Sequence, residues 1–346
     1  MTAPRDKQGF ALPAVLAVVA VVTLVFLVAI LALDSLAAQT RRAVEQARFE
    51  TQALSLEAHA AYAAAVGQPT PSGLTVPDLA RDADPRLAAD GRAYKVAAAP
   101  QLRLSLQDEA GLINLDSLPR EALGRLFEAL GVAVDQRVAM ADRLSDFSDP
   151  DDLARIDGAE AAAYRDQGLA PPPNGPLRTV DQALGVLGWK QAVPREVWRG
   201  ARDDLTADPT AASMNVNTAT PRALKVLFGF SDDQVAAVLA RRRQAPFAGL
   251  EDLGRAAGVR LSGDAERVYG FPDGRFAVKI TAPGTGLAYR ARIVLSPKDP
   301  ERPVWLEDPA LSLSPASGKA ERLVDAPDFP DPAPSPADPG RPIRGD

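Results

Sequence analysis

The apolar pattern of the chain is dominated by one uninterrupted stretch near its beginning. Residues 10–33 read FALPAVLAVVAVVTLVFLVAILAL and contain no charged side chain. As a helix, this stretch would be about 36 Å long, which is enough to cross a bilayer core of about 30 Å. Arg5 and Lys7 precede it and Asp34 follows it. Because basic flanks tend to stay in the cytoplasm, we predict a single membrane span with a cytoplasmic N-terminus.

The helical pattern continues beyond the apolar stretch but becomes amphipathic. Between Leu36 and Tyr62, apolar residues recur at helical spacing, separated by charged residues such as Glu45. No Pro or Gly interrupts this segment before Gly67. We therefore predict one helix over residues 10–66, about 85 Å long, whose second half packs on a globular domain. A membrane helix followed by a flexible stalk is the alternative.

Alternating patterns further along the chain predict an antiparallel sheet that a helical region interrupts. Residues 68–92 are rich in Pro, Asp and Gly and are predicted as a loop, with one short helix at 77–81. The predicted strands cover residues 93–98, 102–107, 274–282, 288–295 and 303–306. The predicted fold class is therefore α+β, with the long N-terminal helix packed on an antiparallel sheet and a large all-α domain inserted into that sheet.

The predicted helical insertion contains an internal repeat. The segment GLINLDSLPREALGRLFEAL, from Gly111, parallels SMNVNTATPRALKVLF, from Ser213. Each copy is predicted to form two helices joined by a tight turn, and residues 244–258 predict a further short helix. The candidate N-caps are Ser117, Thr218 or Thr220, and Ser231, the last forming a capping box with Gln234.

Composition excludes several functional classes. The 346 residues carry a net charge of −6, which argues against a dedicated nucleic-acid binder with a basic face. There is no cysteine, so the chain can form neither a disulfide nor a thiolate metal site. The single histidine, His59, lies inside a predicted helix, and no Ser or Cys nucleophile motif accompanies it. We therefore predict that the protein is not an enzyme.

A candidate processing site precedes the apolar stretch. Gly9 stands directly before Phe10, behind a short basic leader. The apolar stretch is longer than that of a secretory signal, and no small-residue cleavage motif follows it. A peptidase that cuts after Gly9 at the cytoplasmic membrane face would leave the helix intact and make Phe10 the new N-terminus.

This arrangement resembles the class III signal of type IV pilins and pseudopilins. The resemblance implies that a prepilin peptidase cleaves after Gly9 and methylates Phe10. Most members of the family carry Glu at the fifth mature position, which is Ala14 here. The family's Glu is thought to pair with the terminal amine of a neighbouring subunit, because an unpaired charge in the bilayer is costly. Its absence is typical of subunit K among the minor pseudopilins of type II secretion systems, which implies a place at the filament tip.

Residues 142–188 strengthen the resemblance to pseudopilin K. They contain an acidic D-P-D-D run, a G-A-E segment at 158–160 with a Tyr nearby, and an N-G-P-L segment at 174–177. These pieces resemble the family in order and spacing, as does the N-x-N-T-A segment at 215–219. Phe147 departs from the commoner Trp of the family.

The acidic block is also a candidate metal site on chemical grounds. It places six carboxylates within fifteen residues, on a loop that Pro150 breaks. Their mutual repulsion would be relieved by Ca²⁺, a hard cation that takes six to eight oxygen ligands. The spacing is not that of an EF-hand, so helix caps and solvated turn residues are the alternative. Calcium binding is known in the pseudopilin family, and the candidate ligands are Asp149, Asp151, Asp152, Asp157 and Glu160.

The second copy of the repeat also resembles the helix-hairpin-helix module of DNA-uptake and repair proteins. In that module, backbone N–H groups at a turn bind a phosphate. Here Asp232 and Asp233 stand where the phosphate would dock and would repel it. The basic run at 241–243 suits a solvated helix C-terminus, where it complements the helix dipole. We predict that nucleic-acid binding is not the function, and keep as alternatives a membrane-tethered DNA receptor and a minor pilin of a type IV pilus.

The predicted organisation has six parts. They are a leader (1–9), the transmembrane half (10–33) and amphipathic half (34–67) of the helix, a pilin-like domain (68–110 and 259–324), the inserted α domain (111–258) and a disordered Pro-rich tail (325–346). The resemblance implies an inner-membrane protein with a periplasmic C-terminal region that caps the pseudopilus tip. Its implied partners are minor pseudopilins homologous to subunits I and J, the prepilin peptidase and the inner-membrane assembly platform.

Overall fold

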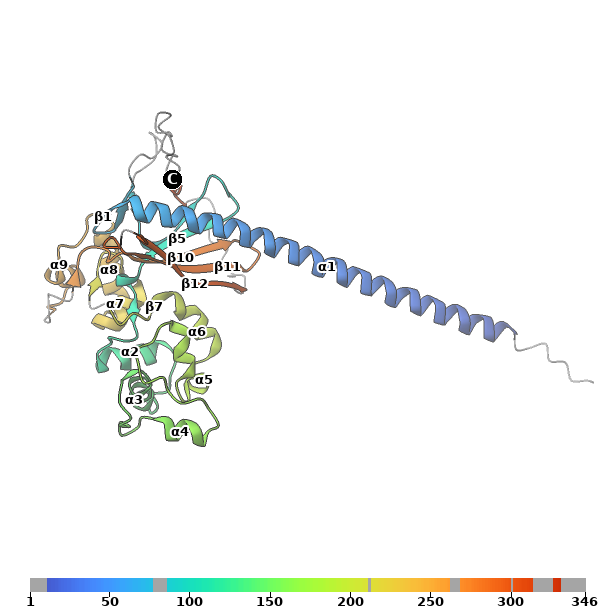
Figure 1. Ribbon diagram of the computed structural model, residues 1–346, viewed down its shortest axis with the longest axis horizontal. Coiled ribbons are helices and arrows are strands. Elements are labelled where there is room, and N and C mark those ends of the chain that lie inside the picture. The colour runs from blue at the N-terminus through green and yellow to red at the C-terminus, as the bar shows by residue number, and fades with distance from the viewer. Residues whose placement is uncertain are drawn as a thin grey trace, which may run out of the picture. The chain divides into compact units, whose positions relative to one another are not determined.

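The chain begins with a long helix that continues into a folded head. The computed structural model describes residues 11–76, 86–210, 213–261, 268–299, 301–313 and 326–330. It forms two compact units, residues 1–54 and 55–346, with the boundary inside the first helix, α1 (Figure 1). α1 runs from Ala11 to Val66 without a break. The helix thus continues through the segment for which a flexible stalk was the alternative.

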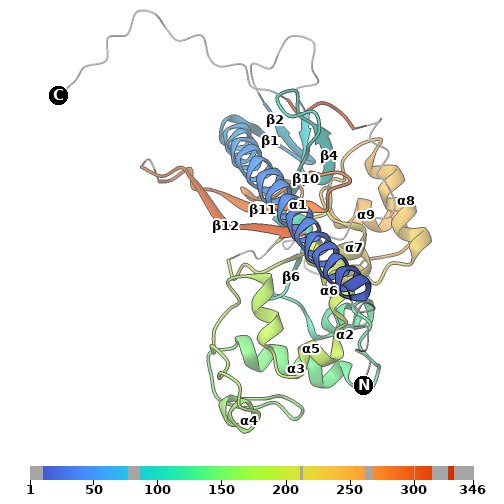
Figure 2. The ribbon, with the colours of Figure 1, turned by 90° about the vertical axis from the view of Figure 1, so that its right-hand side faces the viewer.

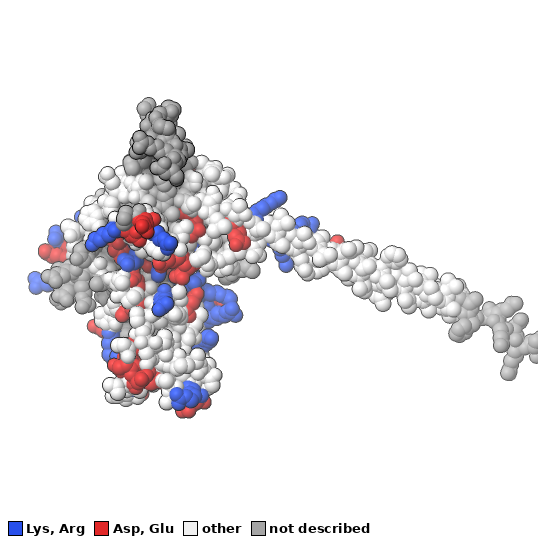
Figure 3. Space-filling model, in the orientation of Figure 1, with Lys and Arg blue, Asp and Glu red and all other residues white. Residues whose placement is uncertain are grey.

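The first part of α1 is apolar on all its sides. Every large apolar side chain from Leu12 to Leu33 is between 47% and 71% exposed. Figure 3 shows no Lys, Arg, Asp or Glu on this part of the helix. The helix has a mean hydropathy of 3.2 in its apolar part and is long and apolar enough to cross a membrane. A helix without a polar face is suited to lipid rather than to water.

A five-stranded antiparallel sheet forms the centre of the second unit (Figure 2). Its order is β12-β11-β10-β5-β4. The strands are β4 (Asp90–Lys95), β5 (Arg103–Asp108), β10 (Arg275–Ala282), β11 (Leu287–Leu295) and β12 (Val304–Leu313). β12 continues past the predicted end at residue 306, although it contains Pro309. Because β12 lies at the edge of the sheet, a residue without an N–H is tolerated there.

The two faces of this sheet differ in character. One face is apolar and buried, and includes Leu104, Leu106, Val278, Ile280, Ala291 and Ile293. The last part of α1, from Ser55 onward, belongs to the same unit and contributes the buried residues Leu56 and Ala60. Tyr289 of β11 donates a hydrogen bond to the buried Glu57 carboxylate at 2.9 Å. The predicted α+β class, with a long helix and an antiparallel sheet, is confirmed.

A helical region is inserted between neighbouring strands of the sheet. β5 and β10 are antiparallel partners, with Phe276 opposite Asp108, so the chain leaves and rejoins the sheet at adjacent positions. The helices between them are α2 (Arg120–Ala129), α3 (Arg137–Ser148), α4 (Ala161–Asp166), α5 (Trp189–Ala192), α6 (Arg195–Ala201), α7 (Pro221–Phe228), α8 (Asp232–Arg242) and α9 (Leu250–Ala257). The described residues also include the 3-10 turns η1 (Glu109–Gly111), which precedes α2, η2 (Val180–Gly185) and η3 (Arg202–Asp204).

The insertion has two apolar cores. In the larger one, the Trp189 ring contacts Phe127 and Trp198, with ring centroids 5.5 and 5.3 Å apart. The smaller core contains Leu224, Phe230, Val235, Val238, Phe247 and Leu253. The two copies of the sequence repeat form the helix pairs α2–α3 and α7–α8. α2 packs on α7, and Arg125 Nε donates to the Val226 carbonyl at 2.7 Å.

The helix caps agree with the sequence in the second copy but not in the first. Thr220 caps α7, and Ser231 forms a capping box with Gln234 at the start of α8, as predicted. The prediction that Ser117 caps α2 is wrong, because the N-cap position is Pro119. Pro119 has no side-chain donor or acceptor, so this helix begins without a side-chain cap.

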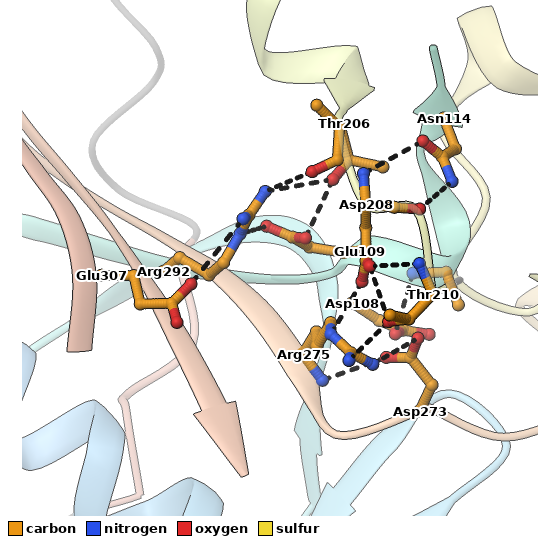
Figure 4. A network of polar contacts seen from close by, with 12 residues as sticks. Asp108, Glu109, Asn114, Thr206, Asp208, Thr210, Asp273, Arg275, Arg292 and Glu307 are labelled. Carbon is orange, nitrogen blue, oxygen red and sulfur yellow. Dashed lines mark hydrogen bonds and ion pairs between the residues drawn. The ribbon is translucent and has the colours of Figure 1, made fainter. Parts of the chain in front are cut away.

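Ion pairs connect the insertion to the charged face of the sheet (Figure 4). Arg292 of β11 pairs with Glu109 at 2.8 Å, and Thr206 Oγ1 donates to the second oxygen of the same carboxylate. Arg275 of β10 pairs with Asp208 at 2.7 Å. Thr206 and Asp208 follow η3, in and just after the short strand β7 (Leu205–Thr206), which pairs with β6 (Ile113–Asn114). The sheet therefore contacts two distant parts of the insertion.

The N-x-N-T-A segment has a structural role at the same junction. Asn215 Nδ2 and Thr218 Oγ1 donate to Asp108 Oδ2 at 2.8 and 2.7 Å. Burial raises the pKa of Asp108 to about 7, although these two hydrogen bonds oppose the shift. Thr218 therefore binds the end of β5 and is not a helix cap.

Two segments that were predicted without regular structure are partly ordered. Residues in the predicted loop form a small antiparallel sheet of β1 (Gln68–Thr70), β2 (Gly73–Thr75) and β3 (Arg86–Ala88). In the predicted disordered tail, residues 326–330 lie beside Lys95, and Phe329 is buried with its ring 5.8 Å from Tyr94. The prediction of disorder is wrong for these five residues, because the one aromatic of the tail completes the head's core. The predicted helix at 77–81 lies outside the described residues.

Candidate metal site

The acidic block forms a loop between two helices of the insertion. α3 ends at Ser148, with Asp149 as its C-cap, and α4 begins after Glu160, which is its N-cap. Pro150 follows the cap directly and cannot continue the helix. The two ends of the loop thus bring Asp149 and Glu160 together, although eleven positions separate them in the chain.

Three of the predicted ligands come together at this point. One carboxylate oxygen from each of Asp149, Asp151 and Glu160 lies within 4.8 Å of the others. Asp149 Oδ1 and both carboxylate oxygens of Glu160 are buried without a hydrogen-bond partner. Buried polar atoms in proteins are almost always paired, so three unpaired oxygens at one place make this loop a candidate site for a cation.

The electrostatics of Glu160 also indicate an excess of negative charge in this loop. Burial raises the pKa of the Glu160 carboxyl, and the nearby charges of Asp146, Asp149, Asp152 and Asp151 raise it further. Both causes disfavour the ionised form that a metal ligand requires. A divalent cation would reverse this balance, because it attracts all of these carboxylates at once.

Asn174 is a candidate ligand that the sequence did not reveal. It lies in the N-G-P-L segment, with φ of 46°. Its Nδ2 donates to the Asp151 carbonyl at 3.0 Å and to Asp152 Oδ1 at 2.7 Å. Its Oδ1 is buried without a partner. An amide oxygen is a hard ligand like a carboxylate, and the motif itself was the only sequence signal for this position.

The remaining predicted ligands have other positions. Asp152 is exposed and accepts the hydrogen bond from Asn174. Asp157 is exposed and does not belong to the group formed by Asp149, Asp151 and Glu160. The sequence grouped all five by proximity along the chain, whereas the folded loop brings together the oxygens of Asp149, Asp151 and Glu160.

Asp146 holds the loop in this conformation. It is fully buried on α3, and its Oδ2 accepts from the N–H groups of Arg155 and Ala159 at 3.1 and 2.9 Å. The Arg155 guanidinium bridges Asp146 Oδ1 and Asp149 Oδ2, each at 2.5 Å. The close approach of Asp146 explains why the G-A-E segment has glycine at position 158. A Cβ on Gly158 would lie 1.8 Å from Asp146 Oδ2, so only glycine fits.

The predicted processing site cannot be placed in the same way. Gly9 and Phe10 lie outside the described residues. Ala14 is in the first turns of α1 and is exposed, within the apolar part of the helix. The structure therefore shows a helix from Ala11 onward and does not test the cleavage.

The turn between α7 and α8 retains the acidic character that the sequence indicated. Gly229 ends α7 with φ of 70°, a left-handed conformation that favours glycine. Asp232 pairs with Lys225, and Asp233 is exposed beside it in the first turn of α8. In the view of Figure 3, acidic and basic side chains are interspersed over the head. These features do not favour the nucleic-acid alternative.

Known protein families and solved structures provide a comparison for this fold. A membrane-length apolar helix that continues into an antiparallel sheet with a helical insertion is consistent with a protein that a single helix anchors in a membrane. Residues 101–198 match the family model of the type II secretion system (T2SS), protein K. The resemblance seen in the sequence to a minor pseudopilin of the K type is thereby confirmed.

A solved structure shows the same fold. The crystal structure of the GspK-GspI-GspJ complex from the type 2 secretion system of enterotoxigenic Escherichia coli contains a chain with a TM-score of 0.55. The sequences are 18% identical, and the match covers 80% of this chain and 100% of that chain. No curated protein sequence matches the chain.

The close contact at Gly158 gives a direct test of the loop. We expect Gly158→Ala to lower the free energy of unfolding by about 1–3 kcal/mol, since the added methyl overpacks against the buried Asp146. Gly124→Ala is the matched control, because a Cβ there meets nothing within 4 Å. In the middle of α2 it should stabilise by about 0.5–1 kcal/mol. Urea unfolding of both variants measures the difference; equal effects would show that the loop is not held by Asp146.

Proposed function

We propose that the protein is a minor pseudopilin that caps the tip of a type II secretion pseudopilus and helps to start its assembly. The match of residues 101–198 to protein K carries this proposal. The large insertion between β5 and β10 supports it, because further subunits would have difficulty stacking above such a head. The role is one of assembly rather than catalysis.

We infer that the chain spans the inner membrane once, with its N-terminus in the cytoplasm and its head in the periplasm. Arg5 and Lys7 before the apolar stretch support this orientation. Cleavage after Gly9 would leave α1, which begins at Ala11, intact. Ala14 would then be the fifth residue of the mature chain. Because alanine carries no charge, this subunit would not need the terminal amine of a neighbouring subunit to neutralise a Glu in the bilayer.

The processing step has a measurable product. In cells that contain a prepilin peptidase, the mature chain should begin with methylated Phe10, which mass spectrometry of the intact protein would detect. Gly9→Leu should block this cleavage, since it replaces the smallest residue at the expected cut. Ala14→Glu should leave cleavage unchanged, because position 14 lies beyond the cut. A mature terminus elsewhere would contradict the assignment.

We propose that the head binds the minor pseudopilins that correspond to GspI and GspJ. The support is the fold shared with a chain of the GspK-GspI-GspJ complex. Coexpression of all three proteins followed by affinity purification of this chain should recover a ternary complex. A head that elutes alone at micromolar concentration would count against the tip assignment, while leaving the membrane anchor and the processing site untouched.

We further propose that the acidic loop binds Ca²⁺. The residues fit this ion, because Asp149, Asp151 and Glu160 contribute carboxylate oxygens and Asn174 contributes an amide oxygen, several of them buried and unpaired. When bound, the cation would neutralise the repulsion around Glu160. It would also connect the ends of α3 and α4, and thereby add to the rigidity that Asp146 already gives the loop.

Calcium titration by calorimetry tests this site. Glu160→Gln should weaken binding at least about tenfold, because it removes a buried negative ligand. Asp157→Asn removes the same charge from an exposed position outside the group and should leave the affinity within about twofold. Equal effects of the two substitutions would indicate non-specific screening rather than a site.

Calcium binding should also weaken as the pH falls. The raised pKa of Glu160 means that a proton competes with calcium at a higher pH than for an ordinary glutamate. In the metal-free protein, the folded state then binds more protons than the unfolded state above the usual glutamate range, so stability falls as pH rises. Calcium should reverse this contribution, and Glu160→Gln should remove it while leaving the similar contribution of Asp108 in place, as thermal unfolding at several pH values would show.

The helix pairs α2–α3 and α7–α8 are, on this proposal, helix-hairpin-helix-like units used for packing. Their support is the sequence repeat and the contact of α2 with α7. The acidic turn before α8 would repel a phosphate, so sharing this motif with DNA-binding proteins does not bring their function with it.

A further inference from the structure

Asn174 and Gly175 form the single Asn-Gly pair of the chain. The other asparagines, Asn114, Asn215 and Asn217, are followed by leucine, valine and threonine. In an Asn-Gly pair, the backbone nitrogen of the glycine lies close to the amide carbon of the asparagine, and no β-carbon on the glycine hinders its approach. The pair is therefore suited to an intramolecular reaction that the other asparagines undergo much more slowly.

The fold leaves this pair open to the reaction. Asn174 is half-buried, has a positive φ of 46° and lies in a bend outside the helices and strands. Within the described part of the chain, the Gly175 N–H donates no hydrogen bond. Apart from its chain neighbours, a Cβ on Gly175 would meet only the Pro173 carbonyl oxygen, at 3.8 Å. The glycine nitrogen is therefore unpaired, and its surroundings are not crowded.

We propose that Asn174 is a deamidation site. The Gly175 nitrogen attacks Asn174 Cγ, and the bond between Cγ and Nδ2 breaks. The proton of the attacking nitrogen leaves with Nδ2 as ammonia, and a cyclic succinimide remains. Water then opens one of the two C–N bonds of the ring, which gives aspartate or isoaspartate. Either product carries a free carboxylate where the chain had a neutral amide.

The new carboxylate would lie in the acidic loop. In the asparagine form, Asn174 Nδ2 donates to the Asp151 carbonyl at 3.0 Å and to Asp152 Oδ1 at 2.7 Å. An ionised carboxylate has no donor to offer, so both acceptors would lose this partner and face a further negative charge. Without a cation, deamidation should therefore destabilise the loop.

The effect on metal binding has the opposite sign, and it rests on the calcium site proposed above. Deamidation would replace the neutral Asn174 ligand with a charged one, beside the carboxylates of Asp149, Asp151 and Glu160. Affinity for calcium rises with the charge of the ligands. The reaction would thus convert a loop that is complete without calcium at Asn174 into one that depends on it more strongly.

Peptide mapping by mass spectrometry tests the reaction, on the full chain in detergent incubated at neutral pH without calcium. Deamidated residue 174 should accumulate with time, while Asn114, Asn215 and Asn217 stay unchanged. Gly175→Ala should lower the rate at least about tenfold, because its methyl group hinders the approach to Cγ, although the fold has room for it. No product at residue 174, or an undiminished rate in Gly175→Ala, would overturn the proposal.

Calorimetry on Asn174→Asp, which imitates one product, tests the consequence. Its calcium Kd should fall about fivefold, because it gains a charged ligand. Its melting temperature without calcium should fall as well, since two donated hydrogen bonds are lost. Gln191→Glu adds the same charge at an exposed position of α5 and should leave both values unchanged.

The two measurements separate the possible failures. An unchanged calcium Kd in Asn174→Asp would overturn the role of the new carboxylate as a ligand. If neither the original chain nor Asn174→Asp binds calcium, the calcium site fails and this role fails with it. Peptide mapping decides the deamidation independently of both results, because it needs no calcium.

Discussion

The end of β5 is the point on which the head depends. Asp108 and Glu109 are adjacent, and both are buried. A buried carboxylate is costly unless donors surround it, and here the donors come from far along the chain: Thr218 and Asn215 for Asp108, Arg292 for Glu109. The sheet and the returning end of the insertion must therefore meet in one arrangement. This junction lets a strand pair accept a large insertion without losing its register.

The acidic loop contains one buried carboxylate that is fully hydrogen-bonded and another that is not. Asp146 is satisfied by two backbone N–H groups and by Arg155, and so acts as a structural anchor. Glu160, a short distance away, is buried with both of its oxygens unpaired. Asp146 thus has all of its partners within the protein, whereas the unpaired oxygens of Glu160 belong to the part of the loop that we propose as a cation site.

The first part of α1 and the central sheet differ in how their apolar surfaces are covered. α1 keeps a uniformly apolar first part, which needs lipid or other subunits around it, while its last turns contribute to the core of the head. The apolar face of the sheet is used inside the head. Its charged face is used to hold the insertion through Arg275 and Arg292. Much of both faces is thus used within one subunit, whereas successive residues of the edge strand β12, such as Trp305 and Leu306, remain exposed and are free for other interactions.

Local patterns determined the elements of this protein. The uncharged stretch, the alternating strands, and the caps Thr220 and Ser231 could be read directly, since each depends on residues close together in the chain. Patterns of this range could not show that Thr218 binds Asp108 instead of capping a helix, or that Phe329 enters the core. Both contacts join residues more than a hundred positions apart.

The candidate site divides in the same way. The sequence determined that carboxylates crowd the loop after α3, and it supplied Asp149, Asp151 and Glu160. Only the tertiary structure decided that Asp157 stays outside this group and that Asn174 joins the loop from the N-G-P-L segment. The physical reason is that composition sets how much charge a loop carries, whereas its turns, fixed here by Asp146, set which oxygens converge.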